Sequence, residues 1–599
     1  MDERLIKERM EKNNANARML TKLMFSLLPV QILLAAVDSL DCFVSSYFAS
    51  NFVGVKAMSA VGLYSPINLF VGALSLILAG GTSIICGKYL GRNEQEKLQN
   101  VFSLNLMVTF LVSAVLTILF IVCGLFDLTG FLTSDMTVRP IFNSYLIGLG
   151  IGLLPNILTN QLPVFLSIEN MNRRTLTSSI VYVVSTIILN FLFVQVMHLE
   201  AFGLALASSV GNWIFFAVQI QYFLSGKSDL KILLRKPDMS DAKEIVATGL
   251  PGAASNAYQT IRGLIVNRLI EVFVGSIGIS AFATADNLLR IFWAIPAGML
   301  TVSRLLISVS IGEEDRQTLT DVMRVMFRRF LPLMGTVSAL IIFFSKPLTT
   351  LFYQDSADPV FMMTVWGLRI LPLCMPFSII CMHFVCYAQA SGKQFLIHIL
   401  SLLDGVVCVA GFTALLIPYL GIRSVYIANV INGIVTTAVI ILYAWNKNGK
   451  LPKKMDELMV IPDDFGFAED ERLDLSVRNI EEVVQISRTV QDFCLKKGID
   501  KRRAYLAGLS MEEMAGNVVE HGFKKDKKKH SVDVRVVHKD KDVILRIKDD
   551  CIPFDPGERR QLIDENDPTR NIGIRMIYKI AQDVQYQNML GLNVLTIKI

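Results

Sequence analysis

Three aspartates interrupt long apolar stretches of the sequence and are the first candidates for chemistry. Asp38 and Asp41 lie in VDSLDCFVSSYF, and Asp286 lies in ADNLLRIF. A carboxylate inside the apolar part of a membrane is costly, so such residues usually line a cavity or an ion path. We therefore expect Asp38 and Asp41 to be the strongest candidates for lining a cavity or an ion path, with Asp286 as a further candidate.

Two of these aspartates have an alternative interpretation. Asp41 is also compatible with a place near the end of its helix, where water would solvate it. Asp286 has three arginines on neighbouring turns, with which it could form a charge network. A purely structural ion pair and a contact with a bound molecule both remain open for Asp286. The three arginines are Arg262, Arg268 and Arg290.

A different pattern of polar residues occurs near the C-terminus. In MEEMAGNVVEHGF, Glu513, Asn517 and His521 recur every four residues. Side chains four residues apart lie on the same face of a helix, so these three form one stripe. Such a stripe is either a binding surface or an ordinary solvated helix face.

Composition separates the chain into an apolar front and a charged back. The whole chain is 52% hydrophobic and 18% charged, yet residues 451–599 hold 26 basic and 27 acidic residues among 149. Only 32 basic and 25 acidic residues remain for 1–450. The front therefore reads as membrane-embedded and the back as soluble. The mild net positive charge belongs to the loops of the front, which gives no sign of a nucleic-acid surface.

The nine cysteines lie mostly within apolar runs and show no paired CxxC spacing. This usage favours reduced or lipid-buried thiols over a disulfide framework. The tightest group, Cys381, His383 and Cys386, lies within one apolar helix and is expected to pack rather than to bind metal.

About twelve apolar stretches are long enough to cross a bilayer as helices. The first six lie near 21–49, 59–87, 101–126, 140–167, 175–197 and 202–224, and the second six near 245–273, 278–310, 329–353, 361–388, 395–417 and 422–446. Lys and Arg gather in alternate loops, which places those loops and both termini in the cytoplasm of a multi-pass inner-membrane protein. The expected divisions are a cytoplasmic segment at 1–20, one lobe at 21–224, a linker at 225–244, a second lobe at 245–446, a linker at 447–474 and a cytoplasmic domain at 475–599.

The two sets of six stretches repeat each other at an offset of 221 residues. GVKAMSAVGLYSPINLF from Gly54 matches GSIGISAFATADNLLRIF from Gly275, and the turn beginning at Gly91 matches the turn beginning at Gly312. Such a repeat predicts two similar six-helix bundles side by side with a cavity between them. This arrangement suits alternating access.

Residues 20–446 resemble the multidrug and toxic compound extrusion (MATE) transporters. The resemblance rests on the repeat, Pro29, the acidic first span, the Gly-x-x-Ala-x-Ser-Ala step and the GKYLGRNE turn. It implies an all-α fold of twelve membrane helices and antiport coupled to Na⁺ or H⁺. In that family an acidic residue of the first helix commonly serves the ion site, which would be Asp38 or Asp41 here. The implied partners are membrane lipid and a small organic or amphiphilic substrate.

Residues 475–599 read as an α/β sandwich. Helices are predicted near 478–497, 501–522 and 571–582, with strands near 531–538 and 541–549 and two more at the end. The Glu513 stripe, IKDDCIPFDP and RNIGIRMIYKIAQDVQY come in the order of the boxes of anti-sigma-factor serine kinases. These kinases belong to the histidine-kinase-like ATPase superfamily, and the resemblance implies an ATP-binding domain.

That resemblance also implies roles for single residues. Asn517 would offer its carbonyl to Mg²⁺, which prefers hard oxygen ligands, and His521 would line the same site. Glu513 would act as a general base or orient the attacking hydroxyl. Asp549 would accept the adenine amino group, and the backbone near Gly573 would face phosphate oxygens.

Two positions depart from the kinase pattern. Cys551 stands where the second box normally has glycine, and Arg570 with Asn571 stand before Gly573 where another glycine is frequent. A side chain at 551 could crowd the purine, since glycine there permits close backbone approach. The sequence thus still favours an intact ATP and Mg²⁺ site, although a nucleotide-free interaction module is the alternative.

The chain has no G-x-x-x-x-G-K-[ST] phosphate loop, so ATP is expected to regulate transport rather than to drive it. The leading hypothesis is a cation-coupled efflux transporter or flippase regulated by its ATP-binding domain. A membrane-anchored serine/threonine kinase that acts on a cytoplasmic protein resembling an anti-sigma-factor antagonist is the alternative.

Overall fold

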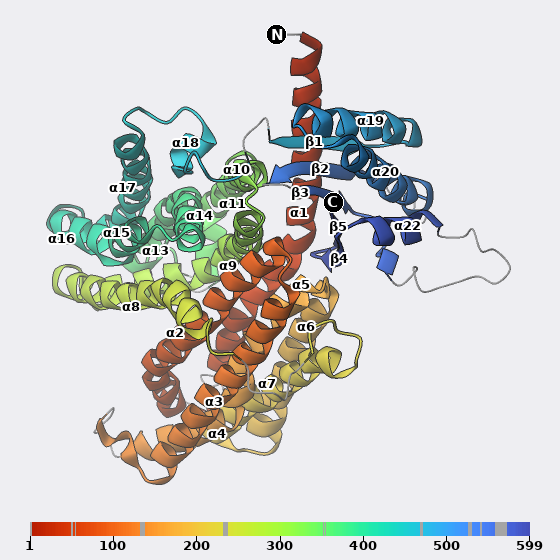
Figure 1. Ribbon diagram of the computed structural model, residues 1–599. Coiled ribbons are helices and arrows are strands. Elements are labelled where there is room, and N and C mark those ends of the chain that lie inside the picture. Colours follow the sequence, from red (N-terminus) through yellow and green to blue (C-terminus); the bar gives the residue numbers. More distant parts are fainter. Residues whose placement is uncertain are drawn as a thin grey trace.

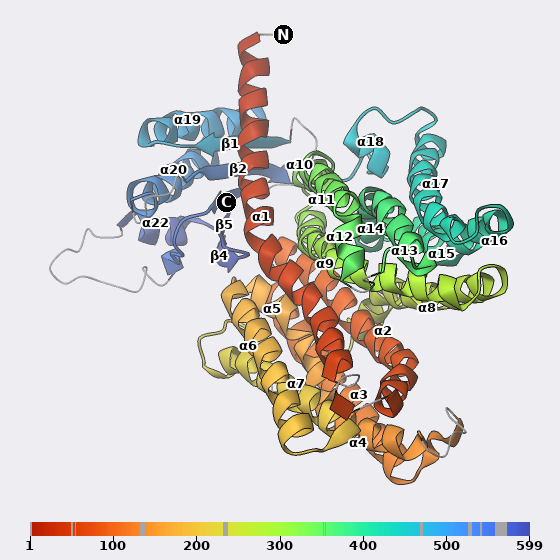
Figure 2. The same cartoon turned by 180° about the vertical axis from the view of Figure 1, so that it is seen from behind.

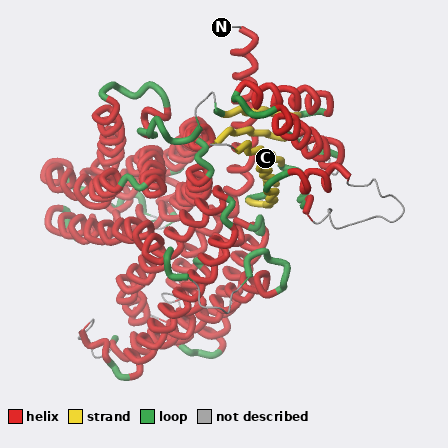
Figure 3. The backbone as a smooth tube through the Cα atoms, in the orientation of Figure 1, coloured by secondary structure: helices red, strands yellow, loops and turns green. Residues whose placement is uncertain are grey.

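The computed structural model describes residues 3–48, 52–53, 55–131, 138–231, 238–351, 353, 355–467, 471–524, 530–539, 542–557 and 572–599. A large helical bundle carries a smaller α/β domain at one end, here called the domain end (Figure 1). Strands occur only in the smaller domain within the described part of the chain (Figure 3).

The helices of the bundle form two lobes that follow each other along the chain. The first lobe contains α1 (Glu3–Phe48), α2 (Val55–Arg92), α3 (Gln95–Leu125), η2 (Leu128–Phe131), α4 (Arg139–Thr159), α5 (Leu162–Ile168), α6 (Asn172–Asn190), η3 (Phe191–Val196) and α7 (Glu200–Leu224). The second contains α8 (Ala242–Phe273), α9 (Ser276–Gly312), α10 (Arg316–Val325), η4 (Met326–Phe330), α11 (Leu331–Phe343), α12 (Ser345–Thr350), α13 (Pro359–Ile370), η5 (Leu371–Cys374), α14 (Met375–Ser391), α15 (Gln394–Leu402), η6 (Leu403–Val407), α16 (Cys408–Leu420) and α17 (Arg423–Asn448).

Eleven helical stretches of the described residues are long and apolar enough to cross a membrane. They overlap eleven of the predicted spans, although the span predicted at 329–353 lies at Arg316–Phe343 in the structure. The remaining predicted span, 245–273, corresponds to α8, which is helical throughout. Its lower hydropathy follows from charged residues in its second half, namely Arg262, Arg268 and Glu271.

The lobes meet at the domain end and diverge away from it (Figures 1 and 2). A Cβ at Gly91 of α2 would collide with the backbone of α9, and a Cβ at Gly312 of α9 would collide with the backbone of α2. Gly91 and Gly312 are equivalent in the 221-residue repeat. The turns that follow also match, because Asn93 and Glu314 both have a positive φ, of 62° and 52°. The repeat seen in the sequence is therefore a structural repeat, and glycine lets its two copies touch.

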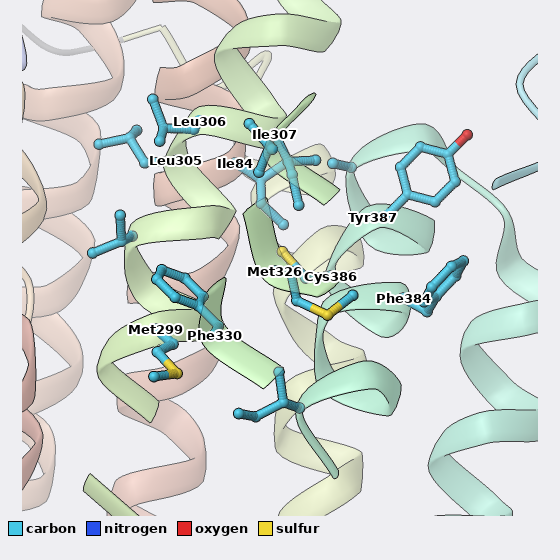
Figure 4. Packing of buried hydrophobic residues seen from close by; sticks show 14 of the residues in the cluster. Ile84, Met299, Leu305, Leu306, Ile307, Met326, Phe330, Phe384, Cys386 and Tyr387 are labelled. Atoms are coloured by element: carbon cyan, nitrogen blue, oxygen red, sulfur yellow. The ribbon is translucent and has the colours of Figure 1, made fainter. Parts of the chain in front are cut away.

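The apolar interior runs across this seam. Ile84 of α2 lies in the same buried cluster as Met299 and Ile307 of α9 and Phe330 at the end of η4 (Figure 4). Dense packing of this kind, in which one added methylene is felt, holds the two lobes in register at the domain end.

The C-terminal domain is a five-stranded antiparallel sheet with helices on one face. The sheet order is β1-β2-β3-β5-β4. Val534, Leu545 and Ile597 point into the core that the helices cover. The strands are β1 (Arg472–Val477), β2 (Val532–Lys539), β3 (Asp542–Asp549), β4 (Asp583–Met589) and β5 (Leu592–Lys598), and the helices are α19 (Ile480–Lys496), α20 (Lys501–Asn517), η7 (Val518–Gly522) and α22 (Ile572–Ile580).

Two elements were not predicted from the sequence. Strand β1 crosses the expected boundary between the linker and the domain at 474/475, and its pairing with β2 makes it part of the domain. A short helix, α18 (Met455–Met459), lies within the expected linker. Both are short and lie in polar sequence, so periodicity alone gives little signal for them.

Candidate functional site

Glu513 and Asn517 lie one turn apart near the end of α20, and both are half-buried. The helix changes to a π-helical turn directly after Asn517, with the Phe523 amide donating to the Val518 carbonyl at 3.1 Å. His521 lies in this turn and is exposed. Single π-turns inside α-helices frequently mark functional sites.

Gly573 lies in the first turn of α22, against the carboxylate of Glu513. A Cβ at this glycine would collide with that carboxylate. The structure thus brings together two predicted site residues from segments 60 positions apart. Arg570 and Asn571, which also belong to the predicted lid, lie outside the described residues.

Asp549 ends β3 and is 4% exposed. Its Oδ1 accepts hydrogen bonds from the Asn593 side chain at 2.7 Å and from the Cys551 amide at 3.0 Å. Burial raises the pKa of Asp549, although these hydrogen bonds act in the opposite direction. The Tyr586 hydroxyl donates to Asn593 at 2.8 Å, so the carboxylate is held by a network and does not rotate freely.

Cys551 is buried, and its side chain leans against Gly522 at the end of the π-turn. A Cβ at Gly522 would lie 3.1 Å from the Cys551 sulfur. Because residue 522 is glycine, there is room beside it for the Cys551 sulfur. A glycine at 551 would have no side chain and would not need this room. The departure at 551 is accommodated by local packing.

The transporter candidates are placed less closely together. Asp41 lies in α1, and the Ser208 hydroxyl of α7 donates to it at 3.5 Å. Asp38 lies in the same helix, but its side chain lies outside the described residues. Asp286 pairs with Arg290 at 3.4 Å, and both side chains are about half exposed.

The charge network expected around Asp286 does not include the other two arginines. Arg262 donates to the carbonyl of Asp404 at 3.1 Å, and Arg268 pairs with Glu271 at 2.7 Å. Asp404, in the π-helical η6, also accepts a hydrogen bond from Asn432 at 2.8 Å. It is an acidic residue of an apolar span that was not predicted as a site, although the cost of intramembrane charge would have identified it.

The outer face of the C-terminal sheet contacts the second lobe through buried ion pairs. Lys548 donates to Glu313 at 2.7 Å, and the two side chains are 20% and 1% exposed. Arg535 bridges Asp315 and Asp474, both at 2.6 Å. This interface was not predicted from the sequence.

Electrostatics favours the charged forms across this interface. Burial would raise the pKa of Asp315, but the charge and hydrogen bonds of Arg535 outweigh it and hold that pKa well below its usual range. Burial would likewise lower the pKa of Arg535, but its two carboxylate partners raise it instead.

One carboxyl near this interface has a raised pKa instead of a lowered one. Asp533 of β2 is 9% exposed, its Oδ2 has no hydrogen-bond partner, and burial raises its pKa to about 6.

The connecting segment and the β4–β5 hairpin add contacts to both lobes. Arg316 donates to the Pro462 carbonyl at 2.7 Å, which fixes the connecting segment on the second lobe. The Leu590 amide at the hairpin tip donates to the Ile168 carbonyl of the first lobe at 3.3 Å. Lys22 of α1 pairs with Asp550 at 2.6 Å. Figures 1 and 2 show the sheet on one side of α1.

The profile of the MatE family matches residues 35–194 and 251–411, one match in each lobe. The chain belongs to the MATE family. A second profile, that of the histidine kinase-like ATPase domain, matches residues 477–599 of this MATE protein. A search of the curated proteins found no match.

Solved MATE structures share the fold of the lobes. A crystal structure of MATE in complex with MaL6 is 21% identical, with a TM-score of 0.65, and covers 71% of this chain and 95% of its own. An outward-facing multidrug resistance MATE transporter has the same identity and coverage, with a TM-score of 0.64. A MOP superfamily transporter from Pyrococcus furiosus is 22% identical over 71% and 95%, with a TM-score of 0.64. The predicted fold of a multi-pass MATE protein with a histidine-kinase-like ATPase domain is therefore confirmed.

Proposed function

We propose that this MATE protein is a cation-coupled efflux transporter or flippase, driven by Na⁺ or H⁺ and regulated by its ATP-binding domain. The observation that carries the proposal is the contact of that domain with both lobes at the end where the lobes meet. The termini and the domain are cytoplasmic in this proposal, and the protein spans the inner membrane. Its substrate is a small organic or amphiphilic molecule.

Ion coupling is assigned to Asp38 and Asp41 in the first lobe. The Ser208 hydroxyl of α7 donates to Asp41 at 3.5 Å, so this carboxylate lies between two helices of the first lobe. An acidic side chain at such a place inside an apolar span is typical of an ion path, which supports the assignment. Asp286 and Asp404 are the acidic residues proposed to contact substrate or ions in the second lobe. Of these, Asp404 is tied to two helices through Arg262 and Asn432.

Regulation follows from where the domain binds. Alternating access requires the lobes to separate at the domain end during part of the cycle. The ion pairs of Glu313 and Asp315 attach the sheet to the second lobe, whereas Leu590 and Asp550 attach it to the first. Separation of the lobes would break one set of contacts. The docked domain therefore favours the conformation in which this end is closed.

The nucleotide site fits ATP and Mg²⁺ by its donors. Asn517 supplies a half-buried amide oxygen and Asp549 a buried carboxylate at the end of β3, while Glu513 lies at the start of α22. Asn517 would hold Mg²⁺, which would neutralise part of the phosphate charge when bound. Glu513 would orient or deprotonate a hydroxyl, and His521 would line the exposed side. Nucleotide binding at this site would change how the domain rests on the lobes.

Reconstituted full-length protein tests the proposal. Export of the fluorescent cation ethidium from proteoliposomes is measured with an imposed Na⁺ or H⁺ gradient, with and without MgATP on the domain side. Export should need one of the gradients, and MgATP should change its rate in the wild type but not in Asn517→Ala. Export that ignores both gradients would refute ion coupling, and an equal effect of MgATP on the variant would refute regulation through this site.

The same preparation distinguishes the kinase hypothesis. Transfer of the γ-phosphate to a co-purified cytoplasmic protein, lost in Glu513→Gln and without gradient-driven export, would favour a membrane-anchored kinase. Phosphotransfer together with export would instead make that protein a partner in regulation.

A further inference from the structure

His530, Asp550 and Cys551 converge at one corner of the C-terminal domain. One ligand atom from each lies within 4.8 Å of the other two, and His530 Nδ1 is 2.9 Å from Asp550 Oδ1. The sheet causes this convergence, because β2 and β3 pair antiparallel with Val532 opposite Asp549. The residues just before β2 and just after β3 therefore lie side by side.

We propose that these three side chains bind a divalent transition metal, most readily Zn²⁺. An imidazole nitrogen, a carboxylate oxygen and a thiolate sulfur are all ligands that zinc takes in proteins. Ligand atoms of a tetrahedral zinc site lie roughly 3.3–3.7 Å apart, as metal–ligand bonds of about 2.0–2.3 Å require. The separation between His530 and Asp550 is 2.9 Å and the other two are at most 4.8 Å, so each needs to change by only about 1 Å or less to reach that geometry. The fourth position is left for water or an exogenous ligand.

The three candidate ligands are largely buried, as ligands of a metal site usually are. The side chains of His530 and Asp550 are 1% and 13% exposed, and Cys551 is 6% exposed. The Phe523 ring lies 5.7 Å from the His530 ring and covers it. Side chains that are already shielded from water lose little hydration when they bind a metal, and the surrounding shell limits the access of solvent.

Metal binding moves one proton and releases another. A neutral His530 that donates from Nδ1 to Asp550 Oδ1 passes this proton to solvent and takes one up at Nε2, so that the Nδ1 lone pair binds the metal. The Cys551 S–H bond breaks, its proton goes to solvent, and a metal–sulfur bond forms. Asp550 Oδ2 keeps its 2.6 Å contact with Lys22, which orients the carboxylate as outer partners of metal ligands do.

Cys381, His383 and Cys386 of α14 also lie close together in the sequence, but their environment differs. His383 is fully buried, with one ring nitrogen 2.8 Å from the Ser303 hydroxyl and the other 2.8 Å from the Ile379 carbonyl. Both ring nitrogens of His383 therefore make hydrogen bonds to other groups, and neither contacts Cys381 or Cys386 in those bonds. The His530 group has its cysteine and aspartate within reach instead. The metal site also gives Cys551 a chemical role at a position where similar domains have glycine.

Cobalt spectroscopy on the full-length protein in detergent tests the site. After treatment with a chelator, the protein is titrated with Co²⁺, and the thiolate-to-cobalt charge-transfer absorption is recorded. The wild type should bind one Co²⁺ with this absorption, and one equivalent of Zn²⁺ should remove it. Cys551→Ser should lose the absorption. Cys494→Ala removes another buried thiol of the same domain and should keep it.

Two further variants keep the test decisive if Cys551→Ser fails to fold. His530→Ala should abolish tight binding, whereas Lys22→Met should weaken binding about tenfold while the thiolate absorption remains. A wild type without thiolate absorption would overturn the proposal. Absorption that persists in Cys551→Ser, or unchanged affinity in His530→Ala, would overturn it as well.

Discussion

Replacement of Asp315 by asparagine should release the C-terminal domain from the second lobe. Asp315 is the N-cap of α10, where its Oδ1 accepts from the amides of Gln317 and Thr318. Asparagine caps helices as well as aspartate does. The substitution therefore leaves α10 intact and removes the charge that faces Arg535.

The magnitude follows from the burial of the pair. Removing one partner of a buried ion pair typically costs about 3–5 kcal/mol, because the other charge stays buried without its partner. Arg535 is 14% exposed and keeps Asp474 at 2.6 Å, so the lower end of that range applies. A loss of about 3 kcal/mol corresponds to a docking equilibrium roughly 150-fold weaker.

Hydrogen exchange with mass spectrometry measures this loss on the full-length protein. The Leu590 amide donates to Ile168 across the interface, so the peptide that contains the hairpin tip reports the undocked state. Its exchange should accelerate strongly in Asp315→Asn.

The matched control is Glu94→Gln. Glu94 is the repeat equivalent of Asp315 in the first lobe, and in its pair with Lys97 the two side chains are 32% and 57% exposed, against 1% for Asp315. Such a pair contributes at most about 1 kcal/mol. Unchanged exchange in Asp315→Asn, or equal acceleration in both variants, would refute the assignment of docking energy to the buried pair.

Three other outcomes are expected. Because burial raises the pKa of Asp533 to about 6, folding of the docked domain gains stability from its protonation below about pH 4 and loses it as the pH rises through 6. Asp533→Asn should therefore stabilise the domain at pH 7.5 by roughly 2–3 kcal/mol, seen as a higher melting temperature. It should also flatten the pH dependence of the melting temperature between about pH 4 and 6.5, and no difference from wild type at pH 7.5 would contradict this. Asn517→Ala should abolish Mg²⁺-dependent ATP binding in calorimetry while it leaves the melting temperature without nucleotide unchanged, since Asn517 is only half-buried. Asp41→Asn should abolish gradient-driven ethidium export, whereas Asp127→Asn, at an exposed pair with Arg139, should not, and retained coupling in Asp41→Asn would move the ion site to Asp38 or the second lobe.

The parts of the fold that carry their own periodicity could be predicted from the sequence. Most of the apolar spans, α20 and strands β2 and β3 lie close to their predicted bounds. The span predicted at 329–353 is displaced, since the structure has it at Arg316–Phe343. The convergence of Glu513 and Gly573 followed from a resemblance between ordered boxes. Strand β1 was missed because RLDLSV gains its stability from pairing with β2. A short strand without its partner is marginal in water.

The docking interface could not be predicted, because its partners are far apart in the chain. Glu313 and Lys548 are separated by 235 positions, and their contact depends on how the whole domain rests on the bundle. On β2 and β3, the residues that alternate with the core positions include Arg535 and Lys548. Charged residues at these positions are also typical of a sheet face that is open to water, so the alternation alone does not indicate docking.

The internal repeat explains why the domain rests its charged face on the second lobe. The turns after α2 and α9 have the same backbone, with the left-handed residues Asn93 and Glu314 at equivalent positions. The residue before each differs in sign, since Arg92 in the first lobe corresponds to Glu313 in the second. An arginine at that position would face the lysine and arginines of the sheet, and like charges in a buried site cost several kcal/mol. One reversed charge in a duplicated turn therefore selects which lobe receives the ion pairs. The first lobe is left with the contacts of the hairpin tip and of Lys22 in α1, whose side chain is 56% exposed. These contacts are weaker and would be the first to separate when the lobes move apart.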